Sequence, residues 1–161
     1  MTKCNGCPAI VVAAHNGHVE IVQLLLKSGV HPDISDREKC TALYMACLRG
    51  HTDVISELLS SGADVNTQTN EGATGLAIAS QMGYRDIVVL LLDQKGVDAS
   101  LAGNKQGTPL VRAVSHNHAE IVDMLINAGN GNVRPTFIIL SLSLCVFLST
   151  HISTHPPKYP R

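Results

Sequence analysis

The chain has 161 residues, of which 45% are hydrophobic, 16% charged and 3% aromatic, so we expect one folded domain and a tail rather than a disordered polymer. A formal net charge of −1 and the absence of any cluster of lysine and arginine argue against a nucleic-acid partner. The N-terminal stretch lacks the apolar run of a secretory signal, and we therefore expect a cytoplasmic protein with reduced cysteines, the nucleus being an alternative location.

Four segments of near-equal length follow one another along the chain. They begin at Pro8, Thr41, Thr74 and Thr108, which places the starts 33, 33 and 34 residues apart. In each segment a short apolar stretch leads to a two-residue step: Gly17-His18, Gly50-His51, Gly83-Tyr84 and Asn117-His118. A fixed period of this length predicts a repeat protein in which each unit stacks on its neighbours.

Each segment predicts two helices. A threonine before the short apolar stretch is a preferred N-cap, and in the fourth segment a proline follows it, where a helix tolerates the missing amide. After the step, apolar residues recur at helical spacing within residues 21–26, 54–59, 87–92 and 121–126. These longer helices each close on a glycine that can adopt the left-handed conformation, namely Gly29, Gly62, Gly96 and Gly129.

This pattern resembles the ankyrin repeat. The motifs that carry the resemblance are Thr108-Pro109-Leu110, Ala13-Ala14, Ala46-Cys47, the Gly-His and Gly-Tyr steps, and Gly62-Ala63-Asp64-Val65-Asn66. The resemblance implies an all-α fold, an α-solenoid of about four helix-turn-helix repeats joined by β-hairpin-like loops. We expect this ankyrin repeat domain to cover residues 1–130, with repeats at about 3–35, 36–68, 69–102 and 103–130.

The chain also departs from the ankyrin pattern. Family repeats commonly carry a histidine after Thr-Pro-Leu, and that place is held by Val11, Tyr44, Ala77 and Val111. Lys39 and Gln106 replace hairpin glycines, and Asn117 replaces an inter-helix glycine, which asparagine tolerates because it takes positive φ more readily than other non-glycine residues. One extra residue between Leu92 and Gly96 predicts a bulge at the end of the second helix in repeat three.

Three groups of residues are candidates for chemistry, and none is specific. Cys4 and Cys7 have C-x-x-C spacing, but no second pair of cysteines or histidines completes a zinc site. Cys7 and Cys40 take the same place in successive repeats, about 8–10 Å apart, which exceeds disulfide reach. Beside His116 and His118 no carboxylate or nucleophile recurs at a defined offset. We therefore predict no enzymatic activity, no cofactor and no metal.

By resemblance, the domain is a protein-protein interaction module that binds its partner through hairpin tips and the outward face of the short helices, together forming a concave groove. Register maps these positions onto His15, Asn16, Arg37, Glu38, Cys40, Leu48, Arg49, Asn70, Glu71, Ala73, Gln81, Met82, Asn104, Lys105, Ser115 and His116. Two apolar members, Leu48 and Met82, lie near Arg49, a composition typical of a binding hot spot, although single exposed apolar side chains are also ordinary. We expect a non-enzymatic adaptor that is a monomer and binds another protein.

Also by resemblance alone, Asn66 lies where ankyrin repeats are sometimes hydroxylated by an oxygenase. Such a modification would stabilise the domain and be incidental to binding.

Residues 131–161 form a divergent, apolar and proline-containing tail. All 13 acidic residues precede it, and its three basic residues are therefore unopposed: Arg134, Lys158 and Arg161. Residues 137–148 are apolar on every face, and three interpretations of the tail are open. It covers the apolar end of the last repeat, or it is unstructured, or residues 137–152 tether the protein to a membrane. Twelve apolar residues reach only about 18 Å of the about 30 Å that a span requires.

Overall fold

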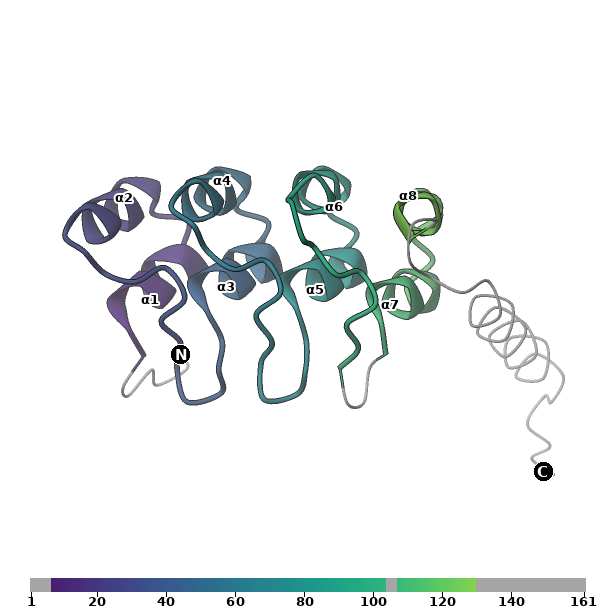
Figure 1. Cartoon of the computed structure of the whole chain (residues 1–161), viewed down its shortest axis with the longest axis horizontal. Helices are drawn as coiled ribbons and strands as arrows, with labels where there is room; N and C mark the ends of the chain where they lie inside the picture. Colours follow the sequence, from purple (N-terminus) through teal and green to yellow (C-terminus); the bar gives the residue numbers. More distant parts are fainter. Residues whose placement is uncertain (1–6, 104–106, 130–161) are drawn as a thin grey trace, which may run out of the picture.

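The computed structural model describes residues 7–103 and 107–129, and within them eight helices follow one another. They are α1 (Ala9–His15), α2 (Val19–Lys27), α3 (Ala42–Arg49), α4 (Thr52–Ser60), α5 (Gly75–Met82), α6 (Arg85–Leu92), α7 (Pro109–Ser115) and α8 (Ala119–Gly129). The odd-numbered helices form an inner row and the even-numbered helices an outer row, and the loops between repeats project beyond the inner row (Figure 1). The pairs α1–α2, α3–α4, α5–α6 and α7–α8 are repeats one to four. This arrangement confirms the predicted all-α solenoid.

Threonines begin the short helices of repeats two, three and four. The side-chain oxygens of Thr41, Thr74 and Thr108 accept a hydrogen bond from the backbone N–H three residues later, at 3.2, 3.1 and 3.4 Å. The donors stand where ankyrin-type repeats commonly carry a histidine: Tyr44, Ala77 and Val111. Pro109 is the first residue of α7, where a backbone donor would have no helical partner. A threonine cap therefore forms in each of these repeats without that histidine.

The turn inside each repeat also joins it to the next repeat. Gly17 and Gly83 have positive φ, and the ring of the following repeat's histidine lies against each of them. A Cβ added to Gly17 would lie 2.7 Å from the ring of His51, and one added to Gly83 would lie 2.6 Å from the ring of His118. Ring Nε2 donates to a carbonyl of the preceding repeat in two places: His51 to His15 at 3.1 Å and His118 to Gln81 at 3.0 Å.

Two non-glycine residues among those described have positive φ, Lys39 at 57° and Asn117 at 60°. Asn117 thus takes the conformation predicted for it. Lys39 is held in its hairpin by Asp36, whose Oδ1 accepts hydrogen bonds from the N–H groups of Glu38 and Cys40, both at 2.9 Å. A carboxylate that fixes the loop offsets the strain of a left-handed lysine.

The core between the two rows is built from equivalent residues of successive repeats. Val54, Ile87 and Ile121 take the same place in α4, α6 and α8 and are 0%, 2% and 2% exposed. Ile21 takes that place in α2 and is 48% exposed, because no described repeat precedes it. Burial at this position therefore depends on the preceding repeat rather than on the helix pair that carries the residue.

The extra residue of repeat three does not bulge its helix, so that prediction is wrong. α6 ends at Leu92, one residue sooner after its tyrosine step than α2 and α4 end after their histidines. The insertion lies in the next turn, where the side-chain amide of Gln94 donates to the carbonyl of Leu90 at 3.0 Å. In repeat two a backbone bond closes the same region, from the N–H of Ala63 to the carbonyl of Leu58 at 3.0 Å.

Loops of neighbouring repeats are also joined by side chains. The amide of Asn66 donates to the carbonyl of Gly96 at 2.8 Å, and its oxygen accepts from the N–H of Asp98 at 2.8 Å. Asn66 therefore joins two successive loops, and its hydroxylation stays a prediction.

Several predictions fall outside the described residues. These are the replacement at Gln106, the three interpretations of residues 131–161 and the anchor at 137–152. The repeat boundaries and the end of the domain at residue 130 also stay predictions. In the described part of the chain, no helix has the length and apolar character needed to cross a membrane.

Candidate partner-binding surface

The last turn of each inner helix, with the residue after it, brings side chains from four repeats into two adjacent lines. We call these eight residues the inner surface: His15, Leu48, Gln81 and Ser115 in one line, and Asn16, Arg49, Met82 and His116 in the other. Met82 is 43% exposed, which is high for an apolar side chain on a helix. The helices hold these residues at fixed spacing, so the inner surface is a rigid array.

Arg49 joins repeats one and two across the inner surface. Its Nε donates to Nε2 of His15 at 2.9 Å. Among the described residues Arg49 forms no ion pair, and its side chain is exposed. Its guanidinium therefore keeps donors that a partner's carboxylate can use.

Arg112 is a buried cation that the sequence analysis missed. It is 3% exposed, and its Nη1 donates to Oε1 of Gln81 at 2.8 Å, while its buried Nε has no hydrogen-bond partner among the residues that the structure describes. Burial lowers the pKa of Arg112 below its ordinary value, although arginine stays protonated at neutral pH. Alignment of the repeats could have drawn attention to Arg112. Met45 and Ile78 take the same place in α3 and α5, so Arg112 puts a cation where the other repeats carry an apolar side chain.

Leu48 is half-buried and packs against the core, so it offers a partner only part of its side chain. Met82 is therefore the main apolar contact of the inner surface. The predicted pair of apolar residues beside Arg49 is present, with unequal exposure.

The hairpin residues divide into exposed and buried sets. Four of the predicted partner contacts there are exposed: Arg37, Glu38, Asn70 and Glu71. Ala73 is 2% exposed, so the expectation that it faces a partner is wrong: the hairpin closes over it, and its N–H donates to Oγ1 of Thr69 at 3.2 Å. Cys40 is only half-buried, whereas Asn104 and Lys105 lie outside the described residues.

Thiol and metal chemistry finds little support in the described residues. Burial, followed by the charges of Asp36 and Glu38, raises the pKa of Cys40 to about 11, and burial also raises the pKa of Cys47. Both are therefore thiols rather than nucleophilic thiolates at neutral pH. Over residues 7–103 and 107–129, no three His, Cys, Asp or Glu side chains are grouped so that they could hold a metal ion.

His116 contacts two other residues of its own repeat. Its Nδ1 lies 3.0 Å from the carbonyl of Arg112, and its ring stacks on that of His118 with centroids 6.3 Å apart. One edge of the His116 ring remains on the inner surface.

A family model described as ankyrin repeats (3 copies) matches residues 1–69 and 62–135. The chain belongs to the ankyrin repeat family. Ankyrin repeats are generally protein-protein interaction modules, and they are typically not enzymes. A comparison with curated proteins found no significant match.

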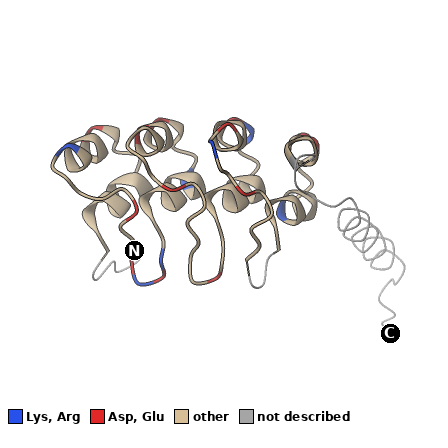
Figure 2. Ribbon diagram, in the orientation of Figure 1, with Lys and Arg blue, Asp and Glu red and all other residues tan. Residues whose placement is uncertain are grey.

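Charge is divided between the two rows of the ankyrin stack. The inner helices contain no Asp or Glu, and Arg49 and Arg112 are their only Lys or Arg residues. Acidic side chains lie on the outer helices and in the loops, as Figure 2 shows in red. Because Arg112 is buried, Arg49 is the exposed cation of the inner helices in this ankyrin domain.

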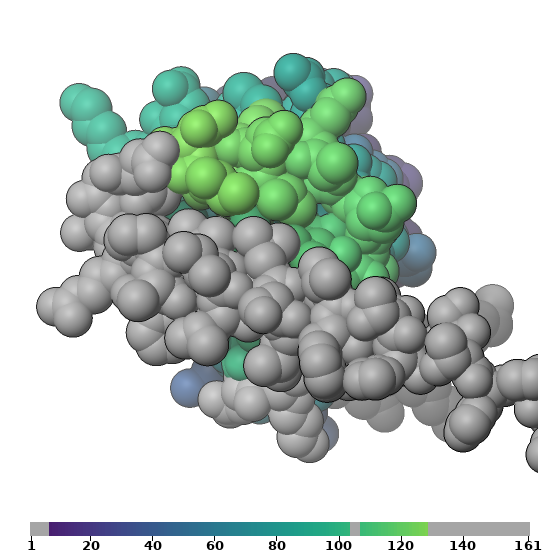
Figure 3. Space-filling model, turned by 90° about the vertical axis from the view of Figure 1, so that its right-hand side faces the viewer, coloured from purple at the N-terminus to yellow at the C-terminus, as the bar shows by residue number. Residues whose placement is uncertain are grey.

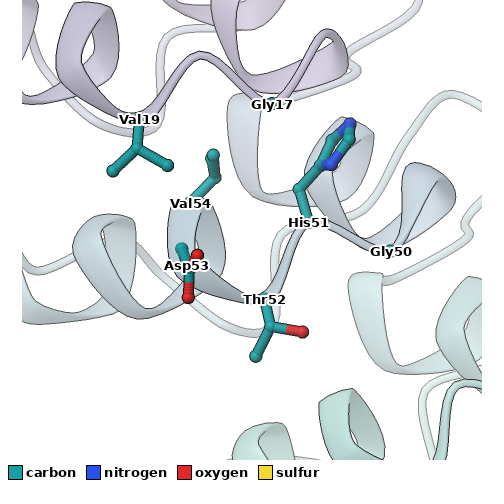
Figure 4. A pocket seen from close by; sticks show the side chains of 7 residues that line it. All are labelled: Gly17, Val19, Gly50, His51, Thr52, Asp53 and Val54. Atoms are coloured by element: carbon teal, nitrogen blue, oxygen red, sulfur yellow. The ribbon is translucent and has the colours of Figure 1, made fainter.

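The described residues form at least two hollows away from the predicted contacts of the ankyrin domain. One, of about 380 Å³, is formed where repeats one and two meet. The ring of His51, which lines this hollow, lies beside Gly17 (Figure 4). The second, which we call the outer hollow, has about 700 Å³ and is lined by Thr52, Ser56, Asp86, Val89, Leu90, Leu92, Asp93, Met124 and Asn127. None of these lining residues was among the partner contacts predicted from the sequence.

Proposed function

We propose that the chain is a non-enzymatic, monomeric adaptor of the cytoplasm or nucleus that binds one segment of a partner protein through the inner surface and the hairpin tips. The observation that carries the proposal is the exposed Met82 in line with the exposed Arg49, which forms no ion pair among the described residues, on an array from four repeats. Arginine is enriched among the residues that contribute most binding energy, and methionine is enriched at protein interfaces. We expect the partner segment to carry an apolar side chain for Met82 and a carboxylate for Arg49.

Charge and polarity changes on the inner surface test this proposal. We expect Met82→Glu and Arg49→Glu each to weaken binding of one specific partner at least about tenfold, or about 1.4 kcal/mol. Proximity labelling identifies the partner, and titration of the purified pair gives the affinity. Leu48 is unsuitable for this test, because its half-buried side chain also packs against the core.

Two variants with similar chemistry elsewhere serve as controls. Ile21→Glu changes an apolar residue that is 48% exposed on α2, and Lys27→Glu reverses an exposed charge at the end of α2. Both should keep the partner. Binding that survives Met82→Glu and Arg49→Glu, or that is lost equally in the controls, would refute the inner surface as the binding site.

A further inference from the structure

The outer hollow combines an apolar floor with an acidic edge. Val89 is 44% exposed, and Leu90, Leu92 and Met124 are half-buried around it. Two carboxylates, Asp86 and Asp93, belong to the lining, which contains no lysine or arginine. The nearby Arg85 is already engaged, since it pairs with Asp86 at 3.5 Å and with Glu120 at 3.3 Å.

The apolar character of Val89 is not needed for stacking. The same place holds Gln23 in α2, Ser56 in α4 and Asp123 in α8. In repeat one that polar residue even helps to join the repeats, because Gln23 donates to Glu57 of α4 at 3.0 Å. In repeat three, the exposed Val89 and the neighbouring leucines and methionine of the lining form an apolar surface. The stacking of the repeats does not require an apolar residue in this place.

We propose that the outer hollow binds the chain's own C-terminal segment, residues 131–161. This segment carries the complementary chemistry: an apolar run over residues 137–148, and three basic residues with no acidic residue among them. In this proposal apolar side chains of the run fill the hollow, and a basic residue lies near the carboxylate of Asp93, since Asp86 already pairs with Arg85. The inner surface remains free for a partner, so this contact is independent of the proposed function.

The place where the described chain ends makes this contact reachable. α8 ends at Gly129, two residues after Asn127, which itself lines the hollow. Figure 3 views the stack from the end that α8 forms. Neighbouring helices lie about 8–10 Å apart, and the seven residues from 130 to 136 can span up to about 25 Å. Tethering also raises the local concentration of the segment to the millimolar range.

A thiol within the segment allows the contact to be trapped. In a full-length Val89→Cys variant under mild oxidation, we expect an intramolecular disulfide to Cys145, identified by peptide mapping without reduction. Ile21→Cys is the control, since Ile21 is similarly exposed, at 48%, but lies on α2. Equal trapping in both variants would overturn the proposal. Disulfide-linked dimers of the Val89→Cys variant would also overturn it, because the occupant would then be a second copy.

Hydrogen exchange gives a second readout that does not depend on where Cys145 lies within the hollow. It compares the full chain with a full-length variant carrying Leu140→Asp and Leu144→Asp. We expect α6 and α8 to lose protection in the variant while α2 and α3 keep theirs. Unchanged exchange at α6 would overturn the proposal, and so would a loss confined to α7, because the segment would then cover the end of the stack.

Discussion

Ile87→Ala is expected to lower the free energy of unfolding by about 2–5 kcal/mol, the range for deleting a buried isoleucine side chain. Ile87 is 2% exposed because repeat two covers it, so the truncation leaves a cavity at the boundary between two repeats. The cavity weakens the interface on which the stack depends, and chemical denaturation followed by circular dichroism measures the loss.

Ile21→Ala is the matched control, because Ile21 takes the same place in α2. At 48% exposure it has little packing to lose, and we expect a change of no more than about 0.5 kcal/mol. Comparable losses for Ile21→Ala and Ile87→Ala would mean that burial at this position does not come from the preceding repeat.

Gly83→Ala is expected to destabilise the protein by about 3 kcal/mol, through two separate effects. Gly83 has φ of 80°, a left-handed conformation that disfavours alanine by about 1–2 kcal/mol. An added Cβ would also lie 2.6 Å from the ring of His118, and such overpacking adds about 1–3 kcal/mol. The ring cannot move away freely, since its Nε2 donates to the carbonyl of Gln81 at 3.0 Å.

Gly29→Ala separates the two effects. Gly29 has φ of 91°, yet a Cβ there would meet no atom within 4 Å. We expect only the conformational penalty of about 1–2 kcal/mol from this variant. Urea titrations of both variants give the comparison, and equal losses would contradict the expected steric cost of the contact between the added Cβ and the ring of His118.

The repeat period, the helix caps and the all-α architecture could be predicted from the sequence, because each depends on local signals. Threonine N-caps and glycines in the left-handed conformation are properties of a few adjacent residues, and four copies reinforce them. The positive φ of Asn117 was predictable for the same reason.

Two predictions that were made from the repeat register alone were wrong. Ala73 was assigned to the surface by its place near a hairpin tip, but the fold leaves it 2% exposed. The insertion in repeat three was expected inside α6, whereas the side chain of Gln94 accommodates it in the following turn. Both residues make hydrogen bonds to a residue four positions earlier, Ala73 to Thr69 and Gln94 to Leu90, and the repeat register does not show which backbone conformation allows these bonds.

The buried cation and the outer hollow that the sequence analysis missed share one cause. Arg112 and Val89 were visible only as exceptions within a line of equivalent residues, a cation among apolar side chains and a valine among polar ones. A repeat protein reveals such positions by comparison of its own copies. Assigning a role to them requires burial, hydrogen-bond partners and the shape of the surface, which register alone does not supply.

Hydrogen exchange of the full chain, alone and with its identified partner, tests most directly whether the inner surface is the binding site. We expect the partner to slow exchange in the last turns of α3 and α5 and in the hairpin around Asn70, leaving α4 unchanged. Protection confined to the outer helices would contradict binding through the inner surface.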